Sequence, residues 1–154
     1  MKLVLKIPGT SIDFNVTPQY FLSLFDVYDR EEDFGEYLNK FDPNNRDDLR
    51  FLFKENLFEN EITRNFTTAH KAEVAKELLR ILNDENFNGD DALLELHGDD
   101  FGFSLPSKWD VRDWKDFYLQ GYQVVYDNWG SELAEVGLTL TKPVVFEISR
   151  LHNR

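Results

Sequence analysis

Apolar residues recur at helical spacing through residues 107–130, SKWDVRDWKDFYLQGYQVVYDNWG. Steps of three or four positions separate the large side chains, which places them on one face of a helix that turns about 100° per residue. The members of this stripe are Val111, Trp114, Tyr118, Tyr122, Val125 and Trp129. Ser107 and Asp110 predict an N-terminal cap, and Gly130 predicts the end. We therefore expect a long amphipathic helix over 107–130, on which the other elements pack.

Three other stretches predict strands, from alternation of apolar and polar residues or from apolar residues on both sides of a turn. Residues 2–16 alternate on both sides of Pro8-Gly9-Thr10 and predict an antiparallel hairpin. Residues 92–97 and 101–105 flank a polar turn and predict a central hairpin. Residues 138–148 predict a closing strand, or a strand pair, at the edge of the sheet because Pro143 cannot donate a hydrogen bond there.

Between these stretches the apolar residues return to helical spacing in four further segments. The first begins at Thr17-Pro18, where proline suits the first helical position, and the second at the acidic run Glu31-Glu32-Asp33. A third follows the turn at residues 42–45, and a fourth runs from Thr67 or Thr68 to about Leu82. Strands at both ends with helices between them predict a single α+β domain over residues 1–154. Its antiparallel sheet would combine the N-terminal hairpin, the central hairpin and the C-terminal strand, packed with about five helices.

Composition adds a strong negative charge to this picture. The 154 residues include 29 acidic and 17 basic side chains, for a formal net charge of −12, while 42% are hydrophobic. This hydrophobic content predicts a folded domain. The charge disfavours direct binding of nucleic acid or of an anionic membrane and favours a basic protein partner. The alternative is that the charge serves solubility alone.

The absence of cysteine excludes disulfides, thiol catalysis and thiolate metal sites. The only apolar run near the N-terminus, Leu3 to Leu5, is too short for a signal peptide, and no run could cross a bilayer. We expect a cytoplasmic protein without a cofactor.

One loop matches the calcium-binding pattern of an EF-hand. Oxygen-bearing side chains stand at Asp84, Asn86 and Asn88, Gly89 follows, and Glu95 holds the twelfth position. The eighth position, normally aliphatic, is an aspartate, and the sequence contains no second such loop. The alternative is a polar turn at Asn88-Gly89.

A second candidate for chemistry is His97, which is followed closely by Asp99 and Asp100 and could act with them as an acid–base group. The pairs at residues 90–91 and 99–100 could also hold magnesium if the fold brings them together. A solvated turn is the simpler interpretation. Because no nucleophile elbow, phosphate loop or dinucleotide fingerprint is present, we do not expect an enzyme.

The acidic surface is the third candidate, as a binding face for a basic protein. Asp113, Asp116 and Asp127 share the polar side of the 107–130 helix. An interface also needs apolar anchors, which acids cannot supply. The residues that we select for partner binding are Asp113, Asp116, Asp127, Asp99, Asp100, Phe101, Trp109 and Tyr126. The alternative is that the three aromatic residues cover the core.

In overall character the chain resembles bacterial toxin-immunity proteins, such as those of contact-dependent inhibition systems. The resemblance consists of acidic clusters such as Glu31-Glu32-Asp33 and Asp99-Asp100, many aromatic residues, no cysteine and no catalytic signature. It implies a tight one-to-one complex with a basic, nuclease-like toxin domain. These proteins share no motif, so no residue is carried over. Two alternatives stay open, namely an acidic nucleic-acid mimic that inhibits a nuclease, restriction or CRISPR system, and a metal- or His/Asp-dependent enzyme.

Overall fold

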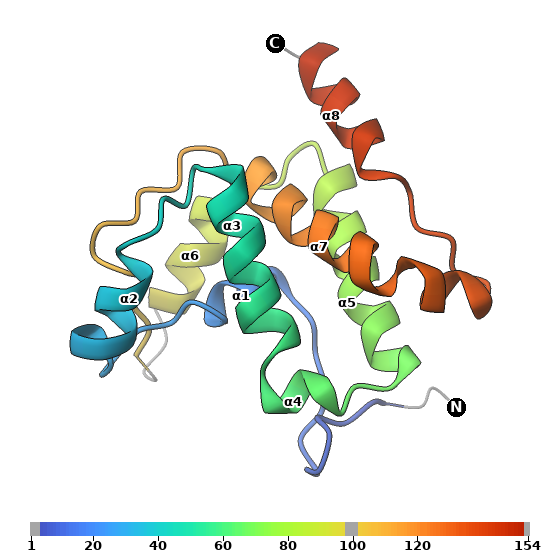
Figure 1. Cartoon of the computed structure of the whole chain (residues 1–154), viewed down its shortest axis with the longest axis horizontal. Helices are drawn as coiled ribbons and strands as arrows, with labels where there is room; N and C mark the ends of the chain where they lie inside the picture. The colour runs from blue at the N-terminus through green and yellow to red at the C-terminus, as the bar shows by residue number, and fades with distance from the viewer. Residues whose placement is uncertain (1–3, 98–101, 153–154) are drawn as a thin grey trace.

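The computed structural model describes residues 4–97 and 102–152, and side chains as far as residue 148. This part of the chain is helical, with 60% helix and 1% strand, and it contains no β-sheet (Figure 1). The prediction of an α+β fold is therefore wrong. The elements are α1 (Pro18–Ser23), the π-helix η1 (Glu31–Gly35), α2 (Glu36–Leu38), α3 (Arg46–Phe53), the π-helix η2 (Lys54–Phe58), α4 (Glu61–Arg64), α5 (Thr68–Asn83), α6 (Gly89–His97), α7 (Trp114–Glu135) and α8 (Pro143–His152).

Helix α7 is the centre of the molecule, as the spacing of its apolar residues predicted, but its limits differ. It begins after Asp113, whose carboxylate accepts a hydrogen bond from the main-chain nitrogen of Asp116, so the predicted cap at Ser107 is wrong. Gly130 lies inside the helix, which ends at Glu135 before Gly137, a residue with a left-handed φ of 90°.

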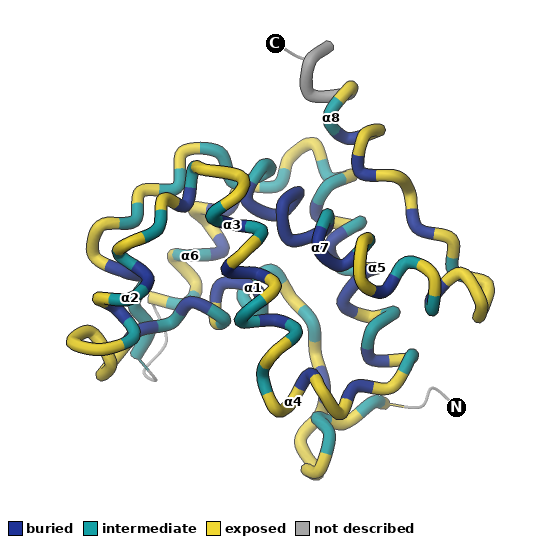
Figure 2. Tube along the Cα trace, viewed as in Figure 1, coloured by how far each residue is buried: buried dark blue, intermediate teal, exposed yellow. Residues whose placement is uncertain are grey.

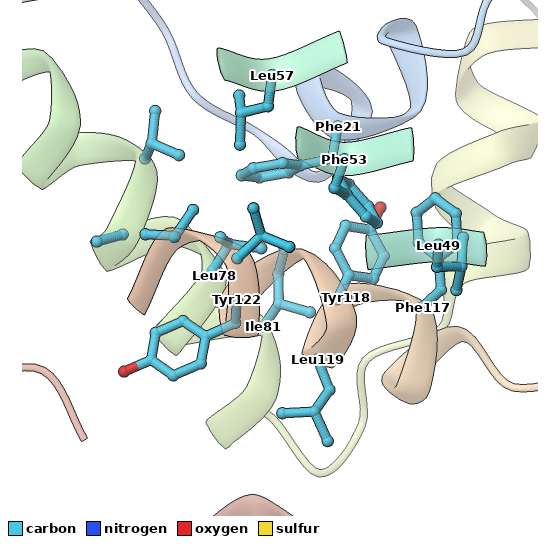
Figure 3. Close-up of a cluster of buried hydrophobic side chains, with 14 of the residues drawn as sticks. Phe21, Leu49, Phe53, Leu57, Leu78, Ile81, Phe117, Tyr118, Leu119 and Tyr122 are labelled. Atoms are coloured by element: carbon cyan, nitrogen blue, oxygen red, sulfur yellow. The ribbon is translucent and has the colours of Figure 1, made fainter. Parts of the chain in front are cut away.

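The middle of α7 is buried around its whole circumference. The predicted polar face includes Gln120, which has no exposed surface and accepts a hydrogen bond of 2.7 Å from Nε of Arg50 on α3. Gly121 lets Phe53 of α3 approach, since a Cβ atom there would lie 3.1 Å from the Phe53 ring. Side chains from α3, α5 and α7 meet in one cluster (Figure 3), so α7 is a central layer and not an outer wall.

The N-terminal hairpin is reduced to a turn. Only Lys6 and Asp13 form a bridge, supported by hydrogen bonds of 2.8 Å from Ile7 to Ile12 and from Phe14 to Leu5. No further strand in the described residues pairs with it. It is held instead by the Phe14 ring, which lies 5.2 Å from Phe66. Nε2 of His70 also donates a hydrogen bond of 2.7 Å to the carbonyl of Lys6, so aromatic packing and this hydrogen bond hold the segment where a sheet was predicted.

The central hairpin is also wrong, because residues 92–97 belong to α6. Helix α6 starts after Asn88, whose side-chain oxygen accepts a hydrogen bond of 2.9 Å from the nitrogen of Asp90. Its Ala-Leu-Leu-Glu-Leu run consists of strong helix formers. Residues 102–105 are irregular and meet the chain again at Val27, which donates a hydrogen bond of 2.8 Å to Ser104.

The predicted C-terminal strand is helix α8. Pro143 is its first residue, a position that suits proline because no intrahelical partner awaits its nitrogen. Phe146 packs against Tyr122 of α7 with ring centres 5.7 Å apart. Figure 2 shows α8 standing out from the body, whereas the middle of α7 is buried. Val144, Val145 and Ile148 of α8 are exposed.

Candidate interaction surface

Residues 26–36, which we call the acidic segment, form an exposed projection at one end of the molecule, around η1 and α2 in Figure 1. The segment holds six carboxylates and one cation, and every residue from 28 to 33 is exposed. The charged residues are Asp26, Asp29, Glu31, Glu32, Asp33, Glu36 and Arg30. Eleven residues therefore carry a net charge of −5, out of −12 for the chain.

The backbone of the acidic segment turns sharply enough to present its carboxylates outward. Asp29 has a φ of 61°, in the left-handed region that Asp tolerates better than most residues. The π-turn then closes through a hydrogen bond of 2.9 Å from Gly35 to the carbonyl of Arg30. Gly35 is buried beside Val27, so the π-turn is fixed on its inner side. Single π-turns of this kind occur often at functional sites.

The acidic segment is held in contact with residues 102–104 by a hydrogen bond and by side-chain packing. One carboxylate oxygen of Asp26 accepts hydrogen bonds from the nitrogens of Tyr28 (3.0 Å) and Ser104 (3.1 Å). Gly102, with a φ of 75°, lies against the Tyr28 ring, which a Cβ atom at position 102 would approach to 2.6 Å. Tyr28 is nevertheless 48% exposed. An aromatic side chain thus stands in a fixed place among the carboxylates.

The charge of the acidic segment is not neutralised locally. Arg30 is exposed, donates to the main-chain oxygen of Asp26 and lies 4.8 Å from the centre of the Phe34 ring. Of the ion pairs in the part of the chain that the structure describes, none includes a carboxylate of residues 26–36. The carboxylates therefore add into one negative potential.

The three aspartates that we selected on the central helix are not brought together. Asp113 caps the start of α7, and Asp116 forms an ion pair of 2.7 Å with Arg46. Asp127 is exposed and accepts a hydrogen bond of 3.0 Å from Gln123. Asp113 and Asp127 lie about 21 Å apart along the helix at 1.5 Å per residue. Two of the three carboxylates thus serve the fold.

Among the selected aromatic residues, Trp109 points inward. Its ring nitrogen donates a hydrogen bond of 2.9 Å to Leu38, and its ring lies 5.3 Å from that of Phe25. Tyr126 is partly exposed and lines, with Asp127, a surface hollow of about 360 Å³. The remaining selected residues, Asp99, Asp100 and Phe101, lie outside the described residues.

The residue that we missed is Tyr28. It lies between Asp26 and the acidic run at 31–33, so an aromatic residue inside a charge cluster was the available signal.

Three side chains of the candidate calcium loop, Asp84, Asn88 and Glu95, each accept a hydrogen bond from within the chain. Asp84 accepts from the nitrogen of Asn86, and Asn88 accepts from the nitrogen of Asp90, both at 2.9 Å. Glu95 lies in α6 and accepts a hydrogen bond of 2.6 Å from Gln19. The first two contacts form short turns, and the third is a hydrogen bond between α1 and α6.

Gly89 and Lys115 have structural roles next to this loop. Gly89 is the first residue of α6 and is buried under Trp114, whose ring a Cβ atom would approach to 2.1 Å. Close packing therefore accounts for this glycine. The ammonium group of Lys115 donates to the carbonyls of Ile81 and Asp84 at the end of α5, which places a positive charge beside the loop.

His97 is exposed at the last residue of α6, with its ring 5.8 Å from that of Phe103. Its predicted partners at positions 99 and 100 are not described. Within residues 4–97 and 102–152, no three His, Asp or Glu side chains gather in a way that could hold a metal ion.

Comparison of the chain with protein-family models, with curated proteins and with solved structures gave no match. Among the helices that the structure describes, none combines the length and the apolar character needed to cross a bilayer.

Proposed function

We propose that this protein is a non-enzymatic, cytoplasmic inhibitor that neutralises a basic toxin domain by forming a tight one-to-one complex. The observation that carries the proposal is the acidic segment, in which five of the six carboxylates are exposed around the exposed ring of Tyr28. Carboxylates supply attraction to Lys and Arg, and the aromatic ring supplies the apolar anchor that binding also needs.

The spacing of the charges explains why this segment suits a protein target. At physiological salt the screening length is about 8 Å, so carboxylates on neighbouring residues act as one charged patch. Such a patch accelerates encounter with a basic surface. Four acids fall within residues 29–33, which is a compact cluster and not the regular row along an extended surface that a nucleic-acid mimic would present.

The first experiment is affinity capture from a lysate of the source organism, washed at low and then at high salt. We expect one basic protein to remain, and we expect co-expression to protect cells from its toxicity. A nucleic-acid enzyme that duplex DNA displaces from the protein would favour the mimic instead. If nothing is captured, or if the captured protein is not basic, the proposal is wrong.

The captured partner then allows a charge test on the acidic segment. Glu31→Gln, Glu32→Gln and Asp33→Asn together remove three exposed charges. We expect association at low salt to slow about tenfold and its salt dependence to flatten, with little change in dissociation. Stopped-flow measurements at several salt concentrations give both quantities.

The matched control removes the same charge from other helices, through Asp47→Asn, Glu73→Gln and Glu135→Gln, which are all exposed. Both variants keep a net charge of −9. Equal effects of the two variants would show that overall charge, and not the acidic segment, governs association.

A further inference from the structure

A groove of about 380 Å³ lies between α1 and α4, and one of its lining residues is only two positions from the acidic segment. Its walls are mainly apolar and include Tyr20 and Leu24 on one side and Ile62 on the other. Ile62 is 54% exposed. The volume lies near the lower end of the range of ligand pockets, which suits one large side chain.

The groove is lined mainly by apolar surface, and its one charged lining residue, Glu61, is exposed. The buried hydroxyl oxygen of Thr63, another lining residue, has no hydrogen-bond partner in the described part of the chain. Burial raises the pKa of Tyr20 to about 12, against a smaller opposite effect of the Thr63 side chain, so the phenol stays neutral at physiological pH. The Ser23 hydroxyl at the edge donates to the carbonyl of Tyr20 at 2.6 Å. Asn60, also at the edge, accepts from the nitrogen of Thr63 at 2.8 Å. The groove therefore favours an apolar occupant.

The surroundings of the groove are strongly acidic. The hydroxyl of Tyr37 on α2 donates to Glu55 on η2 at 2.8 Å, so η2, which precedes α4, contacts the helix that follows the acidic segment. Glu61 lines the groove and is exposed, and Glu59, also exposed, precedes the lining residue Asn60. Residues 26–36 and 54–64 together hold nine carboxylates and three cations, and these 22 residues carry half of the net charge of the chain.

We propose that this groove receives an apolar side chain, Phe or Leu, from a basic partner, with flanking Lys or Arg side chains on the carboxylates around it. Apolar anchors in desolvated pockets, surrounded by charged contacts, are the usual arrangement at protein interfaces. This inference rests on the proposed function and adds the chemistry of the partner segment.

The test uses the ¹⁵N-labelled full chain and three synthetic peptides, Lys-Lys-Phe-Lys-Lys, Lys-Lys-Ser-Lys-Lys and Glu-Glu-Phe-Glu-Glu. With the first peptide we expect NMR shifts at residues 20–24, at 60–63 and in the acidic segment. The serine peptide should shift the acidic segment alone and bind about tenfold more weakly, because it lacks a buried ring. The glutamate peptide should shift neither region.

A variant that blocks the groove separates binding in the groove from binding to the acidic segment. Ser23→Trp places a large ring at the exposed edge and should abolish the shifts at 60–63, while the shifts in the acidic segment persist. Equal binding of the phenylalanine and serine peptides would overturn the groove inference and leave the charge argument of the proposed function intact. NMR shifts at the groove residues with the glutamate peptide would show that the partner does not need basic residues beside the apolar one. A lack of shifts with every peptide would count against both proposals.

Discussion

At the residue scale, several side chains in the core carry a polar atom that reaches a main-chain carbonyl. The Tyr118 hydroxyl donates to Pro18 at 2.9 Å, and the Tyr122 hydroxyl donates to Thr141. Burial raises the pKa of Tyr118 and of Tyr122 far above the ordinary value, so both remain donors throughout the range of stable folding. Aromatic residues therefore fill the core and also fix the first residue of α1 and the segment before α8.

Gly89 gives a residue-scale prediction. Gly89→Ala forces a methyl group into the Trp114 ring, so either α6 or the start of α7 must shift. Overpacking of this kind costs about 1–3 kcal/mol, which urea denaturation would measure as a lower midpoint with an unchanged slope.

Gly130→Ala is the matched control for this change. Gly130 lies within α7, and a Cβ atom there would meet nothing nearer than 3.9 Å. We expect it to leave stability unchanged or to raise it by about 0.5–1 kcal/mol, because alanine loses less conformational entropy than glycine in a helix. A Gly89 variant as stable as the Gly130 variant would show that the contact with Trp114 relaxes without cost.

At the element scale, one arginine joins three helices. Arg46 at the start of α3 pairs with Asp116 of α7 at 2.7 Å and with Glu147 of α8 at 2.8 Å. Besides the packing of Phe146, this pair of contacts holds α8 on the body. The Arg46 side chain is 43% exposed, so solvent screens both ion pairs and their contribution is modest, at about 1 kcal/mol.

Arg46→Gln should therefore loosen α8 more than the rest of the molecule. We expect amide hydrogen exchange in α8 to accelerate about fivefold, while exchange in α5 changes little. Arg80→Gln is the control, because Arg80 pairs with Glu77 inside α5 and should leave α8 unchanged. Equal exchange in α8 for the two variants would show that apolar packing alone holds this helix.

Sequence patterns predicted the helices well where the apolar spacing was long and regular, as in α5 and α7. They failed for α8, because Val144, Phe146 and Ile148 alternate like a strand while only Phe146 is buried. Proline is common both at the first position of a helix and in an edge strand, so Pro143 did not distinguish the two structures. The pattern of apolar residues did not distinguish them either. In α6 the Asn88-Gly89 pair was interpreted as a loop, since the ring of Trp114 that requires Gly89 comes 25 residues later.

The candidate site was predictable in part. The run at residues 31–33 marked the acidic segment as charged, but which carboxylates are free depends on tertiary contacts. Asp116 and Asp127 are indistinguishable in the helical pattern, yet only Asp116 meets Arg46, which lies 70 positions earlier in the chain. A pairing across such a distance leaves no local signal in one sequence.

At the scale of the whole molecule, α7 packs against α3, α5, α6 and α8, so the described elements share one core. The single domain over residues 1–154 stays a prediction. The shared core implies that α7 cannot detach without exposing the apolar faces of its neighbours.

We therefore expect cooperative unfolding. The three tryptophans lie before, at the start of and within α7, so their fluorescence reports on the centre of the molecule, while far-UV circular dichroism reports on all helices. Urea transitions followed by the two signals should coincide. Two separated transitions would show that the N-terminal elements and the α5–α7 pair fold independently.

The late position of α7 in the chain has a consequence for synthesis in the cell. Helices α3 and α5 leave the ribosome before the helix that covers them, and α7 is complete roughly 50 residues after the end of α5. At a translation rate of about 5–20 residues per second, the nascent chain exposes Leu78 and its neighbours on α5 for about 3 to 10 seconds, and Leu49 on α3 for longer. Chaperones that bind emerging apolar segments should therefore engage this chain until α7 has been made.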